Sequence, residues 1–170
     1  ASASSEYMYI ANESNFDFTY NSAYSLGGWI KTTATVGQMI IDKRDASATN
    51  RGYSFRVEST GKIRFYVESG SGVLDVISTT VTVNDGNWHH VFVTKSTAYT
   101  GSGVNLYVDG VLISKTVTTD TLGSSPTLND ISVRVASNDN ATVLFNGSMD
   151  SIAIFNTDIA LSAIQSLCAW

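Results

Sequence analysis

Apolar and polar side chains alternate along most of this chain, and this alternation is the feature that most constrains its fold. From 53 to 58 every second residue is apolar (Tyr53, Phe55, Val57), and the segment 62–68 repeats the pattern. Successive side chains of a β-strand point to opposite faces, so each segment predicts a strand with one buried and one open face.

Short turns between such segments indicate antiparallel pairing. Ser59-Thr60-Gly61 joins the two strands above, and Asp109-Gly110 stands between the apolar runs 104–108 and 111–114. Asp-Gly favours a type I′ hairpin turn, because both central residues need a positive φ. Further strands are expected at 6–10, 24–31, 38–43, 73–83, 89–95, 130–136 and 142–155, with loops at 98–103 and 120–129.

These segments and their Gly, Asn, Asp and Ser punctuation predict an all-β sandwich or barrel. A length of 170 residues suits one domain. We expect that domain at 6–170, after a linker or cut end at 1–5. Helical spacing of apolar residues is confined to 158–167, which predicts a short C-terminal helix.

Charge and cysteine content exclude several classes of function. The net charge is −5 and no run of Lys or Arg occurs, so nucleic-acid binding is disfavoured. No stretch approaches the roughly 18 apolar residues of a membrane span, so no membrane insertion is expected. The single cysteine, Cys168, excludes an intrachain disulfide and gives no sign of an oxidising compartment.

Four segments stand in an order typical of one superfamily. They are YSLGGWI at 24–30, DGNWHHV at 85–91, VNLYVDGV at 104–111 and FNGSMDSIAIFN at 145–156, and ALS follows at 160–162. From Glu6 to Leu167 the chain resembles the laminin G-like domains of the concanavalin A-like lectin/glucanase superfamily. The resemblance implies a two-sheet antiparallel jelly-roll sandwich, mostly used as a non-catalytic carbohydrate-binding or adhesive module. Such modules belong to larger extracellular, cell-surface or virion-surface proteins.

The aromatic residues of these segments have a structural interpretation. We expect Trp29 and Trp88 to point inward and pack in the core, because large aromatic side chains dominate such cores. His89 and His90 are adjacent on a strand, so they point to opposite faces and cannot share one metal ion. We expect one of them to be buried and hydrogen-bonded and the other half exposed.

Catalytic patterns are missing from the sequence. Glycosidases on this sandwich use two carboxylates roughly 5 Å apart, and no glutamate here stands in the Glu-x-Asp-x-x-Glu pattern. Glu58 and Glu68 are the best remaining pair, but ion pairing with Arg56 and Arg64 explains them more simply. No Gly-x-Ser-x-Gly occurs, and Cys168 has no matched histidine. We therefore predict that the chain is not an enzyme.

Outward positions of the paired strands supply the candidate ligand-binding residues. They are Arg56, Arg64, Tyr66, Glu68, Asn105 and Tyr107. The two tyrosines interrupt polar faces with a ring that could stack on a sugar, although they could equally cover the sheet or meet an oligomeric partner. A second candidate is the loop tips with Asp42, Asp45 and Asn50 and with 138–140, although Asn and Asp also arise from turn chemistry.

The resemblance also implies a structural calcium ion. In similar domains an aspartate at the position of Asp150 joins carbonyl groups of the opening strand to hold calcium. Ser151 stands where a second acidic residue often follows, and no contiguous calcium loop occurs. Asp150 is thus the one candidate metal ligand.

Three functions remain open from the sequence. The first is a lectin-like module that binds a glycan or surface polysaccharide. The second is a purely structural or assembly domain, such as a capsid-decorating or fibre component, that contacts protein neighbours. The third is a degraded glycosidase fold with residual hydrolysis.

Overall fold

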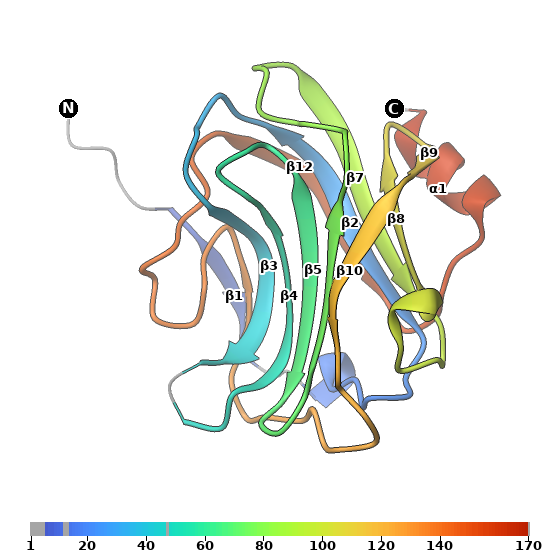
Figure 1. Cartoon of the computed structure of the whole chain (residues 1–170). Coiled ribbons are helices and arrows are strands. Elements are labelled where there is room, and N and C mark those ends of the chain that lie inside the picture. Colours follow the sequence, from blue (N-terminus) through green and yellow to red (C-terminus); the bar gives the residue numbers. More distant parts are fainter. Residues whose placement is uncertain (1–5, 12–13, 47, 170) are drawn as a thin grey trace.

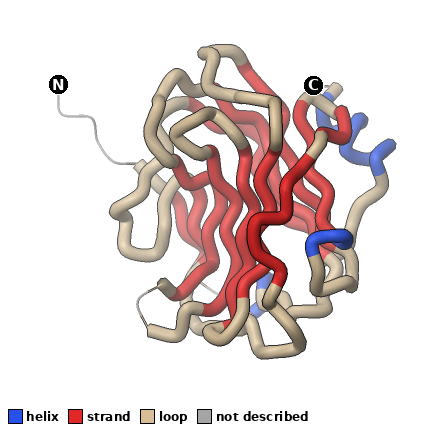
Figure 2. The backbone as a smooth tube through the Cα atoms, in the orientation of Figure 1, coloured by secondary structure: helices blue, strands red, loops and turns tan. Residues whose placement is uncertain are grey.

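The computed structural model describes residues 6–11, 14–46 and 48–169, and these residues form two antiparallel sheets packed face to face (Figures 1 and 2). One sheet has seven strands in the order β1 (Met8–Ile10), β11 (Val133–Val135), β3 (Gln38–Asp45), β4 (Arg51–Val57), β5 (Ile63–Ser69), β6 (Val73–Ser78) and β10 (Lys115–Asp120). The other has five in the order β12 (Ser148–Phe155), β2 (Tyr24–Lys31), β7 (Trp88–Lys95), β8 (Val104–Val108) and β9 (Val111–Ile113). The predicted two-sheet sandwich is confirmed.

The alternation in the sequence corresponds to an inner and an outer face of each sheet. On β5, Ile63, Phe65 and Val67 are buried in the core between the sheets, whereas Arg64 and Tyr66 are partly exposed on the outer face. β5 therefore presents Arg64, Tyr66 and Glu68 on the outer side of the seven-stranded sheet.

The hairpin turn at Asp109-Gly110 forms as predicted. Both residues have positive φ, 51° and 73°, as a type I′ turn requires. Four strand predictions were too long: β1 begins at Met8, β6 ends at Ser78, β11 spans only Val133–Val135 and β12 begins at Ser148. The sequence pattern missed β10 altogether, because this threonine-rich edge strand has no buried apolar face to produce alternation.

The prediction that Trp29 and Trp88 pack in the core is wrong. Ile30 points into the core, so its neighbour Trp29 points to the outer face of the five-stranded sheet. Trp88 lies opposite Lys31, which is two residues beyond Trp29, and therefore points to the same outer face. Trp88 is 43% exposed. The neighbouring histidines do face opposite ways: His90 is buried, His89 is partly exposed, and the buried Nδ1 of His90 has no hydrogen-bond partner within the described residues.

A short helix, α1 (Leu161–Cys168), covers part of the outer face of the five-stranded sheet (Figure 1). Ile164 packs there against Phe92 of β7 and Tyr107 of β8, in a small apolar cluster separate from the main core. The predicted C-terminal helix is confirmed, although it begins at Leu161 rather than 158. Among the described helices, none has the length and apolar character needed to cross a membrane.

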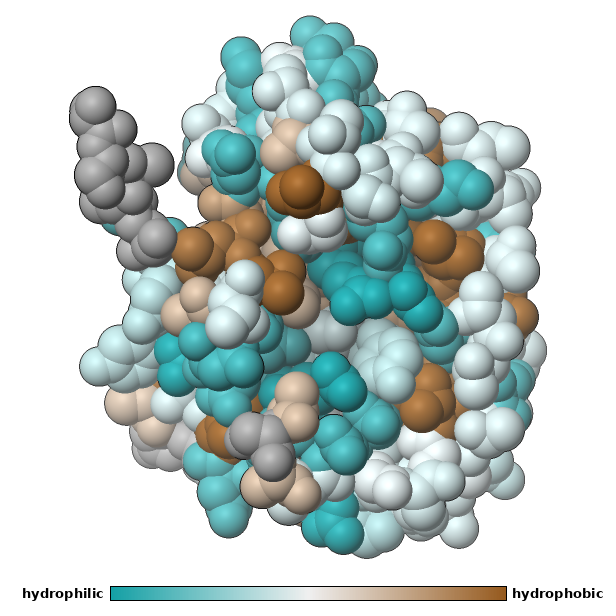
Figure 3. Space-filling model, turned by 60° about the vertical axis from the view of Figure 1, so that its left-hand side comes forward, coloured by the Kyte–Doolittle hydropathy of each residue, from teal (hydrophilic) through white to brown (hydrophobic). Residues whose placement is uncertain are grey.

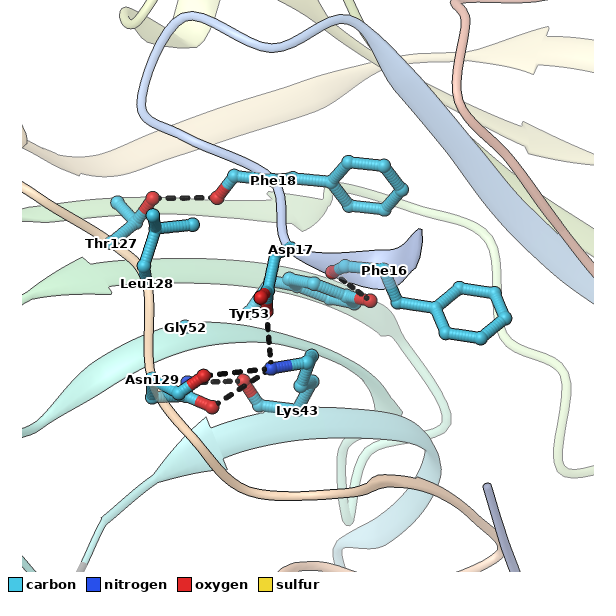
Figure 4. A pocket seen from close by; sticks show the side chains of 9 residues that line it. All are labelled: Phe16, Asp17, Phe18, Lys43, Gly52, Tyr53, Thr127, Leu128 and Asn129. Atoms are coloured by element: carbon cyan, nitrogen blue, oxygen red, sulfur yellow. Dashed lines mark hydrogen bonds and ion pairs between the residues drawn. The ribbon is translucent and has the colours of Figure 1, made fainter. Parts of the chain in front are cut away.

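A buried lysine ties two loops to the edge of the seven-stranded sheet (Figure 4). Lys43 Nζ lies 2.7 Å from Asp17 Oδ1 and donates to the carbonyl and side-chain oxygens of Asn129 at 3.1 and 3.0 Å. Asn129 Nδ2 in turn donates to the Lys43 carbonyl at 3.0 Å. This cluster fixes the segments around Asp17 and Asn129 against β3.

We predict that Lys43→Ala lowers the free energy of unfolding by about 3 kcal/mol, because it leaves a partly buried carboxylate and buried carbonyls without their cation. The exposed Lys31→Ala serves as control and should change stability by less than about 0.5 kcal/mol. Urea unfolding curves measure both. Equal curves for the two variants would contradict a structural role for the buried ammonium group.

Candidate functional site

The outer face of the seven-stranded sheet brings together four of the six predicted binding residues. Arg56 of β4 lies opposite Arg64 of β5, and Tyr66 lies opposite Ser54. Glu68 follows on the same face of β5, because it is two residues beyond Tyr66. Figure 3 looks onto this side of the molecule, where hydrophilic side chains gather in the middle with hydrophobic ones around them.

Ion pairs hold these side chains in place. Arg56 Nε lies 2.7 Å from Glu58 Oε1, and Arg64 Nη1 lies 3.2 Å from the same oxygen. Arg64 also donates two hydrogen bonds to the carboxylate of Asp75 on β6. Burial acts to raise the pKa of Asp75, but the hydrogen bonds from Arg64 and Thr118 outweigh it and hold the pKa below its ordinary value. Asp75 is therefore ionised at neutral pH.

Tyr66 occupies the middle of this charged network. The guanidinium of Arg44 lies 5.0 Å from the centroid of the Tyr66 ring, within the range of a cation–π interaction. Arg44 also forms a 2.6 Å ion pair with Glu68. The ring of Tyr66 is thus fixed by its neighbours on both β3 and β5 while remaining partly exposed.

A pocket of about 100 Å³ opens beside this network. Its lining includes Asp42, Arg44 and Arg56 from the sheet and the loop 138–140 above it. Asp42 Oδ2 accepts a hydrogen bond from the backbone N–H of Asp139 at 3.1 Å. The structure thus joins the two loop regions singled out in the sequence, through Asp42 and 138–140.

The other two residues of those loop regions, Asp45 and Asn50, have a structural role between β3 and β4. Asp45 accepts hydrogen bonds from the backbone N–H groups of Ala48 and Thr49, and Asn50 has a positive φ of 51°. Asp45 ends β3 and Asn50 directly precedes β4, so turn chemistry accounts for both residues.

The predicted platform shared by Tyr66 and Tyr107 is wrong. Tyr107 and Asn105 lie on β8 of the other sheet, and Tyr107 is only 6% exposed because α1 covers it. Two residues that the sequence reading missed belong to the network instead: Arg44 and Asp75. The alternation could have found both. Arg44 is two residues beyond Asp42 and so lies on the same face of β3, and Asp75 interrupts the apolar residues of β6.

Asp150, the predicted calcium ligand, would supply too few oxygen ligands for a calcium ion by itself. It is exposed on β12, and its Oδ1 accepts a hydrogen bond from Ser151 Oγ at 3.3 Å. Over residues 6–11, 14–46 and 48–169, no group of three or more His, Cys, Asp or Glu side chains could hold a metal ion. Calcium takes six to eight oxygens, so these side chains do not make a calcium site without backbone carbonyls.

The calcium prediction requires that a chelator lower the melting temperature of the wild type and leave that of Asp150→Asn unchanged. Differential scanning calorimetry with and without EDTA measures this directly. A wild-type melting temperature that does not respond to EDTA would contradict the prediction of a structural calcium ion.

The pocket at Asp42 predicts a dependence of stability on pH. Burial raises the pKa of Asp42 to about 7, against the opposing effects of hydrogen bonds from the N–H groups of Asp139 and Arg44 and of the Arg44 charge. Arg56 lines the same pocket, and Arg134 faces Asp42 across the β3–β11 pair.

Because the pKa is raised on folding, the folded state holds this proton more tightly than the unfolded state. Its stabilisation is full below about pH 4 and is lost as the pH rises through 7. We predict that wild-type stability, relative to Asp42→Asn, falls by about 2–4 kcal/mol between pH 4 and pH 8. Urea denaturation across that range tests it, and a constant difference between the two proteins would contradict it.

The fold and the matching sequence together define the family. Residues 2–165 match the concanavalin A-like lectin/glucanases superfamily, and the chain belongs to that family. A comparison with curated proteins by sequence gave no match.

Solved structures with the same fold include binding domains of toxins and of a sialidase. The binding domain of Paraclostridial Mosquitocidal Protein 1 is similar with a TM-score of 0.68 at 13% identity, covering 95% of this chain and 40% of that one. A structure of botulinum neurotoxin type C, whose cell entry depends on interaction with two ganglioside molecules, gives 0.66 at 15% identity, covering 95% and 39%. The Ruminococcus gnavus IT-sialidase CBM40 gives 0.65 at 10% identity, covering 88% and 84%.

At these identities the similarity shows the shared fold. The chain spans about 40% of the two toxin structures and 84% of the sialidase module.

Proposed function

We propose that this protein is a non-catalytic, lectin-like module that binds a carbohydrate on the outer face of the seven-stranded sheet. The observation that carries the proposal is the fixed position of Tyr66 among Arg44, Arg64 and Glu68 on that face. An aromatic ring held among planar charged groups offers a sugar both a stacking surface and partners for its hydroxyl groups.

The ion pairs make this face rigid before any ligand binds. Arg44, Arg56 and Arg64 are all held by carboxylates, so few side-chain rotamers need to be lost on binding. A guanidinium has five N–H donors, and a carboxylate can accept several hydrogen bonds, so paired groups keep capacity for ligand hydroxyls. Such a preorganised surface suits the shallow, static recognition expected of a lectin-like domain.

The same ion pairs oppose a hydrolytic function. Glu58 accepts hydrogen bonds from both Arg56 and Arg64, and Glu68 pairs with Arg44, so both carboxylates are already engaged by arginine side chains. Glycoside hydrolysis needs one carboxylic acid that still carries its proton. Glu58 and Glu68, the two best acidic candidates, are instead held by arginines, an arrangement that suits a binding surface.

The structural neighbours support the same function. Their descriptions name binding domains, gangliosides and a sialidase-associated module, and a carbohydrate-binding role for this chain is consistent with them. We extend the proposal to its setting: the module acts at an extracellular, cell or virion surface, where polysaccharide ligands and multivalent attachment occur.

A specific feature also favours the second function, that of an assembly domain. Met8 and Tyr9 are exposed on β1, a strand at the edge of the seven-stranded sheet. An exposed apolar edge strand can pair with another chain. Size-exclusion chromatography with light scattering tests this: a concentration-dependent increase in mass that Tyr9→Lys abolishes would support assembly, and a constant monomer mass would exclude self-association.

For the carbohydrate-binding proposal, we predict that Tyr66→Ala weakens binding to every retained glycan at least tenfold, because the stacking surface is lost. The probe is a glycan array that contains both neutral and sialylated oligosaccharides, followed by calorimetry on the glycans retained. Tyr99→Ala is the matched control, because Tyr99 is 44% exposed and contacts Tyr20 instead of this face.

A second variant protects the test against misfolding. Arg56→Gln removes the charge of a partly exposed arginine of the same face, one that pairs with Glu58. It should weaken binding while leaving the melting temperature within a few degrees of the wild type. Wild-type affinity in both Tyr66→Ala and Arg56→Gln, or no retained glycan at all, would overturn the proposal.

A further inference from the structure

A second hollow surface lies on the opposite side of the molecule, on the outer face of the five-stranded sheet. One hollow of about 230 Å³ is lined by His90, Phe92, Ser151, Ala153 and Leu167. An adjoining hollow of about 430 Å³ is lined by Trp29, Trp88, Asp150 and Ser151. Ser151 lines both, so the two hollows adjoin over β2, β7 and β12, with Leu167 of α1 lining the first, and together we call them the trough.

Strand register explains why the floor of the trough is aromatic. Trp88, His90 and Phe92 alternate along β7 and so point to the same outer face, and Trp29 of β2 lies opposite His90. The ring centroids of Trp29 and His90 are 5.4 Å apart, and those of His90 and Phe92 are 5.5 Å apart at an interplanar angle of 17°. The floor is thus a continuous row of rings.

A glycine and a bulge open the space above this floor. Gly27 lies opposite Phe92, where an added Cβ would come within 2.4 Å of Phe92 Cδ2, so only glycine lets the ring lie flat on the sheet. On the other side, the register of β12 against β2 shifts between Asp150 and Ala153. Ser151 has a positive φ of 51° within this bulge. Bulges commonly redirect side chains at functional sites.

The trough contains a polar atom that the protein leaves unsatisfied. His90 is 2% exposed and lines the trough, yet its buried Nδ1 has no hydrogen-bond partner in the described part of the chain. Leaving a buried polar atom unpaired costs about 1–3 kcal/mol. Burial also lowers the pKa of His90, with the charge of Asp109 acting against this, so the ring is neutral at neutral pH. A neutral imidazole nitrogen either accepts or donates one hydrogen bond according to the tautomer, so a ligand hydroxyl that reaches Nδ1 on binding would satisfy it.

The charges around the trough select the class of ligand. Asp150 lies opposite Trp29, and Lys31 lies opposite Trp88, so one negative and one positive side chain lie beside the two tryptophans. The hydroxyl of Ser151 and the carboxylate of Asp150 stand at the wall. Indole rings next to hydroxyl and carboxylate groups suit a ring with C–H faces and several hydroxyls.

We propose that this trough is a second ligand site, which binds one neutral pyranose unit through Trp29 and Trp88 and through a hydrogen bond to His90. The site is independent of the proposed site on the seven-stranded sheet, because it uses the other sheet and none of the same residues.

Indole N–H resonances test the proposal at the site itself. We titrate the ¹⁵N-labelled protein, in buffer with calcium, with the neutral methyl glycosides of glucose, galactose, mannose and N-acetylglucosamine. The indole signals of Trp29 and Trp88, assigned by Trp29→Phe and Trp88→Phe, are expected to shift with at least one of them. Trp88→Ala should reduce that glycoside's affinity at least tenfold at the Trp29 signal, and Tyr99→Ala should leave it unchanged.

A second variant separates binding from structure. His90→Phe keeps the row of rings and removes the unpaired nitrogen, so the melting temperature should stay the same or rise while glycoside affinity falls about tenfold, the effect of about 1.4 kcal/mol. A purely structural histidine would leave affinity unchanged in this variant.

The possible outcomes distinguish this proposal from the first one. Tyr66→Ala should leave the tryptophan shifts intact, so a failure of the seven-stranded face does not affect this test. The proposal is overturned if no neutral glycoside shifts either indole signal, if the shifts persist in Trp88→Ala, or if only a sialic acid glycoside produces them.

Discussion

The structure depends on one constraint, the strict alternation of buried and exposed side chains along strands in fixed register. A shift of one residue in any pair would move the core side chains into water and the arginines into the core. The pairing of Phe55 with Phe65 inside the sandwich is therefore inseparable from the pairing of Arg56 with Arg64 outside it. The hydrophobic core, by fixing the register, also fixes the geometry of the outer face.

The same constraint gives the molecule two unlike outer surfaces. On the seven-stranded sheet the outward residues of β3 to β6 include arginines, carboxylates and Tyr66, which hold one another through ion pairs and a cation–π contact. On the five-stranded sheet the outer face carries Trp29 of β2 and Trp88, His90 and Phe92 of β7, and α1 covers only part of this face. One surface is polar and rigid, and the other is a trough with an apolar floor.

Local patterns in the sequence predicted most of the sandwich and less of the site. The hairpin at Asp109-Gly110 and the strand 24–31 were found because turn chemistry and alternation are local signals. Parity along β5 likewise placed Arg64 and Tyr66 on an open face. Alternation places a side chain on one face of its strand, but it does not tell which of the two sheets that strand joins. For that reason Tyr107 was wrongly grouped with Tyr66.

The tryptophans show the second limit of sequence reasoning. Trp29 and Trp88 were assigned to the core because large aromatic residues usually lie there. Ile30 of β2 and Val91 of β7 point into the core instead, so the tryptophans at alternating positions on these strands point outward. For Arg44 and Asp75, alternation indicates the outer face, but their pairing with Glu68 and Arg64 depends on contacts between strands that the sequence pattern does not give.

The most direct test of the account is a map of backbone amide shifts when a glycan retained by the wild-type protein is titrated into the ¹⁵N-labelled domain. The account predicts that the largest shifts form a contiguous patch on β3, β4, β5 and β6, centred on Tyr66 and absent from the tips of the distant loops. Shifts confined to the edge strand β1 or scattered over the molecule would contradict it, because recognition would then not depend on the face that the register creates.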